Sequence, residues 1–109
     1  MSALNLIKRV KENFEARGYT VEILSKSNDW FSIGGYKKRG DRRIFARDTY
    51  RHNGTAENVT VTLEIIETLN VHGCGKIIAK IKIPKNASDR VLNNRIDKAI
   101  SIMKTGIVI

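Results

Sequence analysis

The segment GGYKKRGDRR, residues 34–43, concentrates basic residues around a single acid, Asp41. Its cations are Lys37, Lys38, Arg39, Arg42 and Arg43. Ammonium and guanidinium groups replace the counterions that condense on phosphates, so such a cluster can hold a nucleic-acid backbone. A charged run of this kind is also common in turns that are simply hydrated. Its meaning therefore depends on the elements that surround it.

Aromatic residues accompany the cluster, because Trp30 precedes it, Tyr36 lies within it and Phe45 follows it. Flat rings on a protein surface can stack on unpaired bases, which is how many proteins bind single strands. Further cations that could continue a phosphate track are Arg47, Arg51, Lys80, Lys82 and Lys85. Together with the cluster, these residues are the candidate nucleic-acid contacts.

The composition of the whole chain also favours a polyanionic partner. Its 109 residues include 20 Lys and Arg against 11 Asp and Glu, a formal net charge of +9. Such an excess attracts RNA, DNA and acidic protein surfaces over a long range. With 41% hydrophobic residues and one proline, the chain is expected to fold as one compact domain over residues 1–109. The acids Glu57, Glu64 and Glu67 are expected to lie away from the basic residues.

Catalytic chemistry is harder to assemble from this sequence. A metal-dependent nuclease needs carboxylates that converge with a lysine, and the candidates are Asp48, Glu64, Glu67 and Lys80. The common spacing, an acid two residues before the lysine, fails because Ile78 occupies that position.

Histidine and cysteine chemistry is equally sparse. Both histidines, His52 and His72, are expected in turns, although a general-base pairing between them stays open. Cys74 is the single cysteine, so neither an intrachain disulfide nor a cysteine-based zinc site can form. We therefore expect no enzyme activity, no metal site and no cofactor.

The N-terminal half must position the basic cluster. Apolar residues at helical spacing predict a helix over residues 2–17. A change to a period of two predicts a strand from residue 19, and the segments 30–36 and 42–51 are expected to form two more. The cluster then joins these two strands, and the Gly34-Gly35 pair indicates a bulge or a close approach of backbone there.

The C-terminal half is predicted to contain a long hairpin and a second helix. Residues 58–71 alternate clearly, with a bend expected near residues 66–68, and residues 76–83 form the partner strand. In that partner, one phase is Ile77, Ala79, Ile81 and Ile83, and the other is Ile78, Lys80 and Lys82. A helix follows over residues 89–104, and the apolar residues 107–109 are expected to pack or to add a short edge strand.

These elements predict an α+β fold: an N-terminal helix, an antiparallel sheet of four or five strands and a C-terminal helix. Short connections favour both helices on one sheet face, which leaves the other, here named the open face, in water. No apolar run is long enough for a membrane span or a signal peptide, so a cytoplasmic location and no membrane partner are expected. The oligomeric state is not predicted, and the apolar tail is compatible with a dimer.

The order helix, sheet, helix resembles that of the double-stranded RNA-binding domain. That family presents lysines at the start of its second helix, where this chain has at most Lys85 and Arg90. The segment PKNASDR lacks the family's run of lysines, and the family's loop motif is missing. No membership is therefore inferred from the resemblance.

The resulting hypothesis is a non-enzymatic domain that binds RNA or single-stranded nucleic acid with little sequence specificity. RNA is favoured over DNA because the two helices are separated by the whole sheet, unlike those of helix-turn-helix proteins. The alternative is a small inhibitor or adaptor, of the kind found in phages and plasmids, that binds an acidic protein, with or without RNA. Reversing Arg42 and Arg43 to glutamate is expected to abolish binding and to leave thermal stability nearly unchanged.

Overall fold

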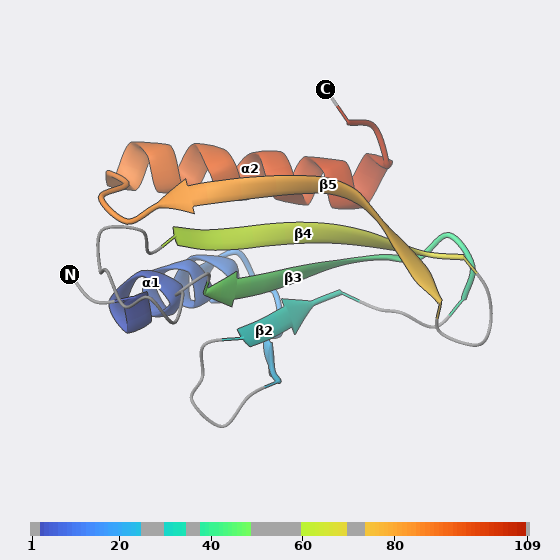
Figure 1. The fold of residues 1–109 in the computed structure, drawn as a ribbon, viewed down its shortest axis with the longest axis horizontal. Helices are drawn as coiled ribbons and strands as arrows, with labels where there is room; N and C mark the ends of the chain where they lie inside the picture. Colours follow the sequence, from blue (N-terminus) through green and yellow to red (C-terminus); the bar gives the residue numbers. More distant parts are fainter. Residues whose placement is uncertain (1–2, 25–29, 35–37, 49–59, 70–73, 109) are drawn as a thin grey trace, which may run out of the picture.

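The computed structural model describes residues 3–24, 30–34, 38–48, 60–69 and 74–108. Among these residues, one helix precedes and another follows five strands along the sequence (Figure 1). The elements are α1 (Ala3–Ala16), β1 (Glu22–Ile23), β2 (Trp30–Ile33), β3 (Arg42–Asp48), β4 (Thr60–Thr68), β5 (Gly75–Pro84) and α2 (Asp89–Thr105). The predicted α+β order is thus confirmed.

The five strands form one antiparallel sheet in which each strand pairs with its neighbours in sequence, in the order β1-β2-β3-β4-β5. One edge is the two-residue β1, and the other edge is the ten-residue β5, which runs beside α2 (Figure 1). Both helices pack on the same face of this sheet, as predicted. They run in the same direction, because Arg9 pairs with Asp89 and Arg17 pairs with Asp97.

The core lies between the helices and the facing side of the sheet. From the sheet it takes every second residue of β2, β3, β4 and β5, as expected for a half-buried antiparallel sheet. Its buried members are Leu6, Ile7, Val10, Phe14, Phe31, Ile33, Ile44, Ala46, Val61, Leu63, Ile65, Ile81, Ile83, Ala87, Leu92, Ile96, Ala99, Ile100 and Ile102.

Local chemistry fixes both ends of α2. The Ser88 hydroxyl accepts a hydrogen bond from the backbone N–H of Val91, which satisfies one of the free donors of the first turn. At the other end, Gly106 adopts a left-handed conformation with φ 72° and donates to the carbonyl of Ile102. Gly106 therefore terminates α2.

A β-bulge in β5 corrects one prediction. The register between β4 and β5 shifts between Ile65 and Ile66, where one extra residue enters β5. Ile78 therefore packs against the core, whereas Ile77 is 46% exposed. The alternation read from the sequence, with Ile77 inside and Ile78 outside, is wrong at this end of β5. Lys80 and Lys82 remain in the phase opposite the core.

Two further predictions concern chain segments at the same end of the molecule. Gly34 has φ 97°, and a Cβ there would lie 3.0 Å from the carbonyl oxygen of Arg42, so the expected close approach of backbone is present. Ile107 and Val108 lie outside any strand and are 63% and 53% exposed, so they neither pack nor extend the sheet.

Neither helix in the described part of the chain combines the length and the apolar character that crossing a bilayer requires.

Candidate nucleic-acid interface

The open face presents the side chains of β2 to β5 that point away from the helices. Three of the candidate contacts, Tyr36, Lys37 and Arg51, lie outside the described residues, as do His52 and His72. The other candidates can be placed by strand register and by their contacts.

One row of cross-strand neighbours contains two of the predicted cations. Arg47 on β3 pairs with Trp30 on one side and with Thr62 on the other, and Thr62 pairs with Lys82 on β5. Side chains directly opposite in such a ladder have Cβ atoms about 4.5–5.5 Å apart. Arg47 and Lys82 are both exposed and form no ion pair with any described residue, so both charges are available to a partner.

The aromatic residues of this face are covered by arginines. The guanidinium carbon of Arg47 lies 5.0 Å from the ring centroid of Trp30, and that of Arg43 lies 5.4 Å from the centroid of Phe45. Both distances are within the range of cation–π attraction. The two rings also contact each other, with centroids 6.4 Å apart. Stacking on a base would require these arginines to move or to share the ring.

The next row is less basic than predicted, because Glu64 is part of it. Glu64 on β4 pairs in register with Phe45 and with Lys80, and its carboxylate lies 3.8 Å from the Lys80 ammonium. The expectation that this acid lies away from the basic residues is wrong, since Glu64 is in the same strand phase as Thr62. The Lys80 charge is therefore partly neutralised.

Arg43 also lies on the open face, but its charge is engaged there. Its Nη2 donates to the Glu22 carboxylate on β1 and, at 2.6 Å, to the hydroxyl of Ser32. These bonds hold the Arg43 guanidinium above β2, and they explain why the Ser32 hydroxyl can be fully buried. Arg43 is thus tied to the sheet and can offer a ligand only part of its guanidinium.

Arg42, one residue away, points to the opposite side of the sheet. Its Nε and Nη2 donate to the carbonyls of Met103 and Lys104 at 2.6 and 3.0 Å, and its Nη1 pairs with Glu67 at 3.2 Å. The first two bonds satisfy carbonyls of the last turn of α2, which the helix itself leaves unpaired. The prediction that Arg42 can be reversed at little cost in stability is therefore contradicted by its contacts.

The loop between β2 and β3 keeps two of its cations exposed. Asp41 accepts from the backbone N–H of Lys38 at 3.1 Å, and Gly40 donates to the carbonyl of Thr68 at 2.9 Å. These bonds fix the end of the loop against β4 and leave the side chains of Lys38 and Arg39 in solvent. The described part of the basic cluster is thus divided: Lys38 and Arg39 form no ion pair with another described residue, whereas Arg42 and Arg43 are bonded to the rest of the fold.

The groups considered for catalysis do not assemble in the described residues. Within those ranges, no three His, Cys, Asp or Glu side chains are placed to hold a metal ion. Glu64 faces the open side, whereas Glu67 pairs with Arg42 near α2. Cys74 is exposed next to the start of β5.

No family model matches the chain, and no curated protein or solved structure is significantly similar to it. The chemistry of its own residues therefore carries the functional argument.

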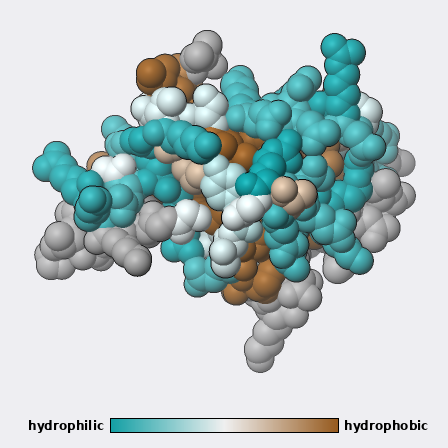
Figure 2. Space-filling view, turned by 180° about the vertical axis from the view of Figure 1, so that it is seen from behind, coloured by the Kyte–Doolittle hydropathy of each residue, from teal (hydrophilic) through white to brown (hydrophobic). Residues whose placement is uncertain are grey.

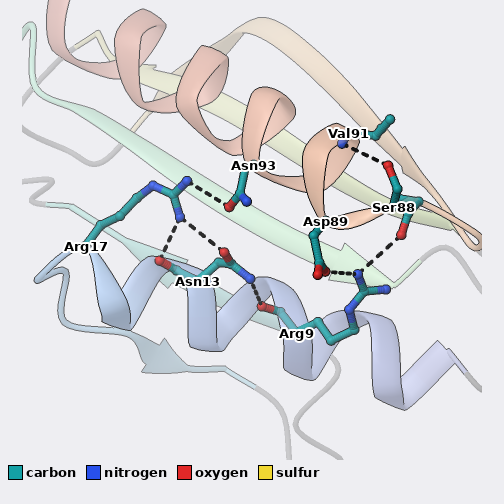
Figure 3. Close-up of polar contacts among 8 residues, drawn as sticks. Arg9, Asn13, Arg17, Ser88, Asp89, Val91 and Asn93 are labelled. Atoms are coloured by element: carbon teal, nitrogen blue, oxygen red, sulfur yellow. Dashed lines mark hydrogen bonds and ion pairs between the residues drawn. The ribbon is translucent and has the colours of Figure 1, made fainter.

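A series of polar contacts, not predicted from the sequence, joins α1 to α2 and is named here the polar ladder (Figure 3). It determines which charged side chains of α2 remain unpaired within the described residues. Arg9 donates to the carboxylate of Asp89 at 2.9 Å and to the carbonyl of Ala87. Arg17 donates to the carboxylate of Asp97 and to the amide oxygen of Asn93, both at 3.1 Å. Both acids of α2 are thereby turned toward α1 and paired.

The signal for this ladder is present in the sequence. Positions 9, 13 and 17 and positions 89, 93 and 97 each recur every four residues, so each set lies on one face of its helix. The segment DRVLNNRIDK looks like a helix of mixed charge, yet Asp89 and Asp97 lie on a different side of the helix from Arg95 and Lys98. Arg95 and Lys98 are left exposed on the side without an acid.

Proposed function

We propose that this protein binds nucleic acid through the open face of its sheet, with little sequence specificity and without catalysing a reaction. The observation that carries the proposal is the row in which Arg47 and Lys82 flank Thr62. Thr62 is only 8% exposed, so the two exposed cations on either side of it form the surface of this row, and they suit phosphate oxygens. Trp30 ends the row and supports Arg47 through its ring.

Lys38 and Arg39 provide a second contact at the other end of β3. Seven residues of strand separate the two ends, which is about 20 Å at about 3.3 Å per residue. A partner that touches both must therefore reach about 20 Å, and a strand in duplex geometry, with about 3.4 Å between phosphates along the axis, spans this length with about six nucleotides. A nucleic-acid strand meets this requirement better than a small anion does.

RNA is the preferred partner within this proposal. The two helices are separated by the whole sheet in sequence and so do not form the compact helix-turn-helix unit that reads the DNA major groove. A cytoplasmic location belongs to the same proposal, because a single exposed cysteine suits a reducing compartment.

An acidic protein is the second candidate partner, and exposed apolar residues favour it. Leu69 and Ile77, near the turn between β4 and β5, are 42% and 46% exposed. Apolar groups next to cations are typical of protein interfaces, where aliphatic contacts accompany charge complementarity. An inhibitor or adaptor that uses this end of the sheet would bind a protein in the absence of nucleic acid.

The proposal is tested with the charge-reversed pair Arg47→Glu and Lys82→Glu. The matched control is Lys8→Glu with Lys11→Glu on α1, which changes the net charge by the same amount on the helix side. Binding to a fluorescent single-stranded RNA is measured by anisotropy at several salt concentrations. We expect the open-face pair to lose at least about tenfold more affinity than the control, because it loses phosphate contacts as well as net charge.

Two results would contradict the proposal. The first is equal binding by the open-face pair and the control, which would mean that only net charge matters. The second is a wild-type protein that binds neither RNA nor DNA at low salt. Pull-down from a cell extract with and without nuclease then separates the candidates, because a partner that survives nuclease treatment supports the protein-binding alternative.

A further inference from the structure

The β5 edge lies beside the basic side of α2. Arg95 and Lys98 are three residues apart on this helix, so their side chains are neighbours on its surface. Both are exposed, and neither forms an ion pair with a described residue. The two acids of α2 cannot neutralise them, since Asp89 and Asp97 pair with α1.

A hydrogen bond attaches this side of α2 to the edge strand. Arg95 donates from Nη1 to the carbonyl oxygen of Lys82 at 3.1 Å. The side chain of Lys82 itself extends on the open face, in the row of Thr62. At Lys82, a cation therefore lies on each side of the β5 edge. The Arg95 guanidinium is on the helix side, and the Lys82 ammonium is on the open face. Lys85, in the turn after β5, adds another cation between the two elements.

These four residues, Lys82, Lys85, Arg95 and Lys98, are named here the β5-edge surface. Neither β5 nor α2 contains an aromatic residue, so this surface has no ring to stack on a base. Figure 2 shows hydrophilic residues over much of the face seen from behind, with a hydrophobic band through its middle. All four residues of the β5-edge surface are themselves charged, which disfavours an apolar ligand there. Its chemistry matches phosphates rather than bases.

We propose that the β5-edge surface binds the two phosphate backbones of a nucleic-acid duplex, with the strand edge directed toward a groove. A ridge that is charged on both sides is complementary to a groove bordered by phosphates on both sides. The major groove of B-DNA, about 12 Å wide, is one groove of this kind. The wide, shallow minor groove of an RNA duplex offers a comparable opening. This inference rests on the proposed function and deepens it, because it names a duplex as the ligand.

The test compares a duplex with its own single strand. RNA and DNA duplexes of about two helical turns, about 20 base pairs, and the separate strands are titrated by fluorescence anisotropy. The variant is Arg95→Glu with Lys98→Glu, and the control is Lys8→Glu with Lys11→Glu. We expect the edge variant to lose at least about tenfold more duplex affinity than the control does, but no more single-strand affinity. The RNA and DNA arms show which duplex is bound.

Each other result counts against the inference in a defined way. If the wild type binds single strands only, or if the edge variant loses no more duplex affinity than the control, the β5-edge surface is not a duplex site, although the proposed function stands. If the wild type binds no nucleic acid, both proposals fail. The pair Arg95→Gln with Lys98→Gln repeats the test in case the reversed charges unfold α2, which circular dichroism detects; it should also lose duplex affinity selectively.

Discussion

The three arginines of β3 have different roles, because the side of the sheet to which each side chain points determines its partners. Arg42 points toward the helices and satisfies carbonyls at the end of α2. Arg43 points to the open face and is held by Glu22 and Ser32. Arg47 points the same way, four residues along, and is exposed above Trp30. From residue type alone, all three arginines are equal candidates for phosphate binding.

Replacement of Arg42 by alanine is expected to lower the free energy of unfolding by about 1–3 kcal/mol. The variant loses two bonds to the last turn of α2 and leaves Glu67, whose side chain is 28% exposed, without its partner. Part of the effect is screened by solvent, since the Arg42 side chain is itself 21% exposed. Urea unfolding followed by circular dichroism measures the change.

The control for this prediction is Arg39→Ala in the same segment. Arg39 is exposed and lacks an ion pair with any described residue, so its loss is expected to change stability by less than about 0.5 kcal/mol. Equal effects of the two substitutions would show that the contacts of Arg42 with α2 contribute nothing. The pair also separates stability from binding, because only Arg39 is proposed to contact phosphate.

At the scale of elements, the bulge in β5 determines which isoleucine is in the core. A regular strand would bury Ile77 and expose Ile78, and the register shift reverses this. We expect Ile78→Ala to lower stability by about 1–2 kcal/mol, less than at a fully buried position, and Ile77→Ala by less than about 1 kcal/mol. Both substitutions lose the same strand propensity, so the difference reports burial. Chemical denaturation measures both, and a larger cost for Ile77→Ala would contradict the bulged register.

The elements themselves could be predicted because their patterns are local. The periods of α1, β4 and α2, and the glycine at position 106, are visible in short windows of sequence. The bulge is not, since a run of isoleucines reads equally well in either phase. Arg42 is bonded to the end of α2, and Glu64 is paired with Lys80 on β5. Both contacts depend on the packing of segments that are distant in sequence, so they could not be predicted from local patterns. The candidate site was therefore predicted as a region, while the role of each cation was not.

At the scale of the whole molecule, exposed cations of the described residues lie on both sides of the sheet, Arg47 and Lys82 on the open face and Arg95 and Lys98 on α2. The ladder between α1 and α2 is responsible for much of this arrangement, because it places Asp89 and Asp97 next to Arg9 and Arg17. Exposed pairs of this kind contribute little to stability, about 0–1 kcal/mol each. Their larger consequence is that neither acid of α2 is left to neutralise Arg95, which bonds the β5 edge, or its neighbour Lys98.

Salt dependence distinguishes this local arrangement from a general attraction of a basic protein to a polyanion. For binding to a B-DNA duplex, the slope of log Kobs against log salt is about −0.9 per phosphate contact, so Arg95→Glu with Lys98→Glu is expected to reduce its magnitude by about 1.8. Lys8→Glu with Lys11→Glu removes the same net charge from α1 and is expected to leave the slope unchanged, because no phosphate contact is lost. Anisotropy titrations between low and physiological salt measure both slopes. Equal reductions in the two variants would mean that the protein attracts duplexes only through its overall charge and that no surface is specialised for them.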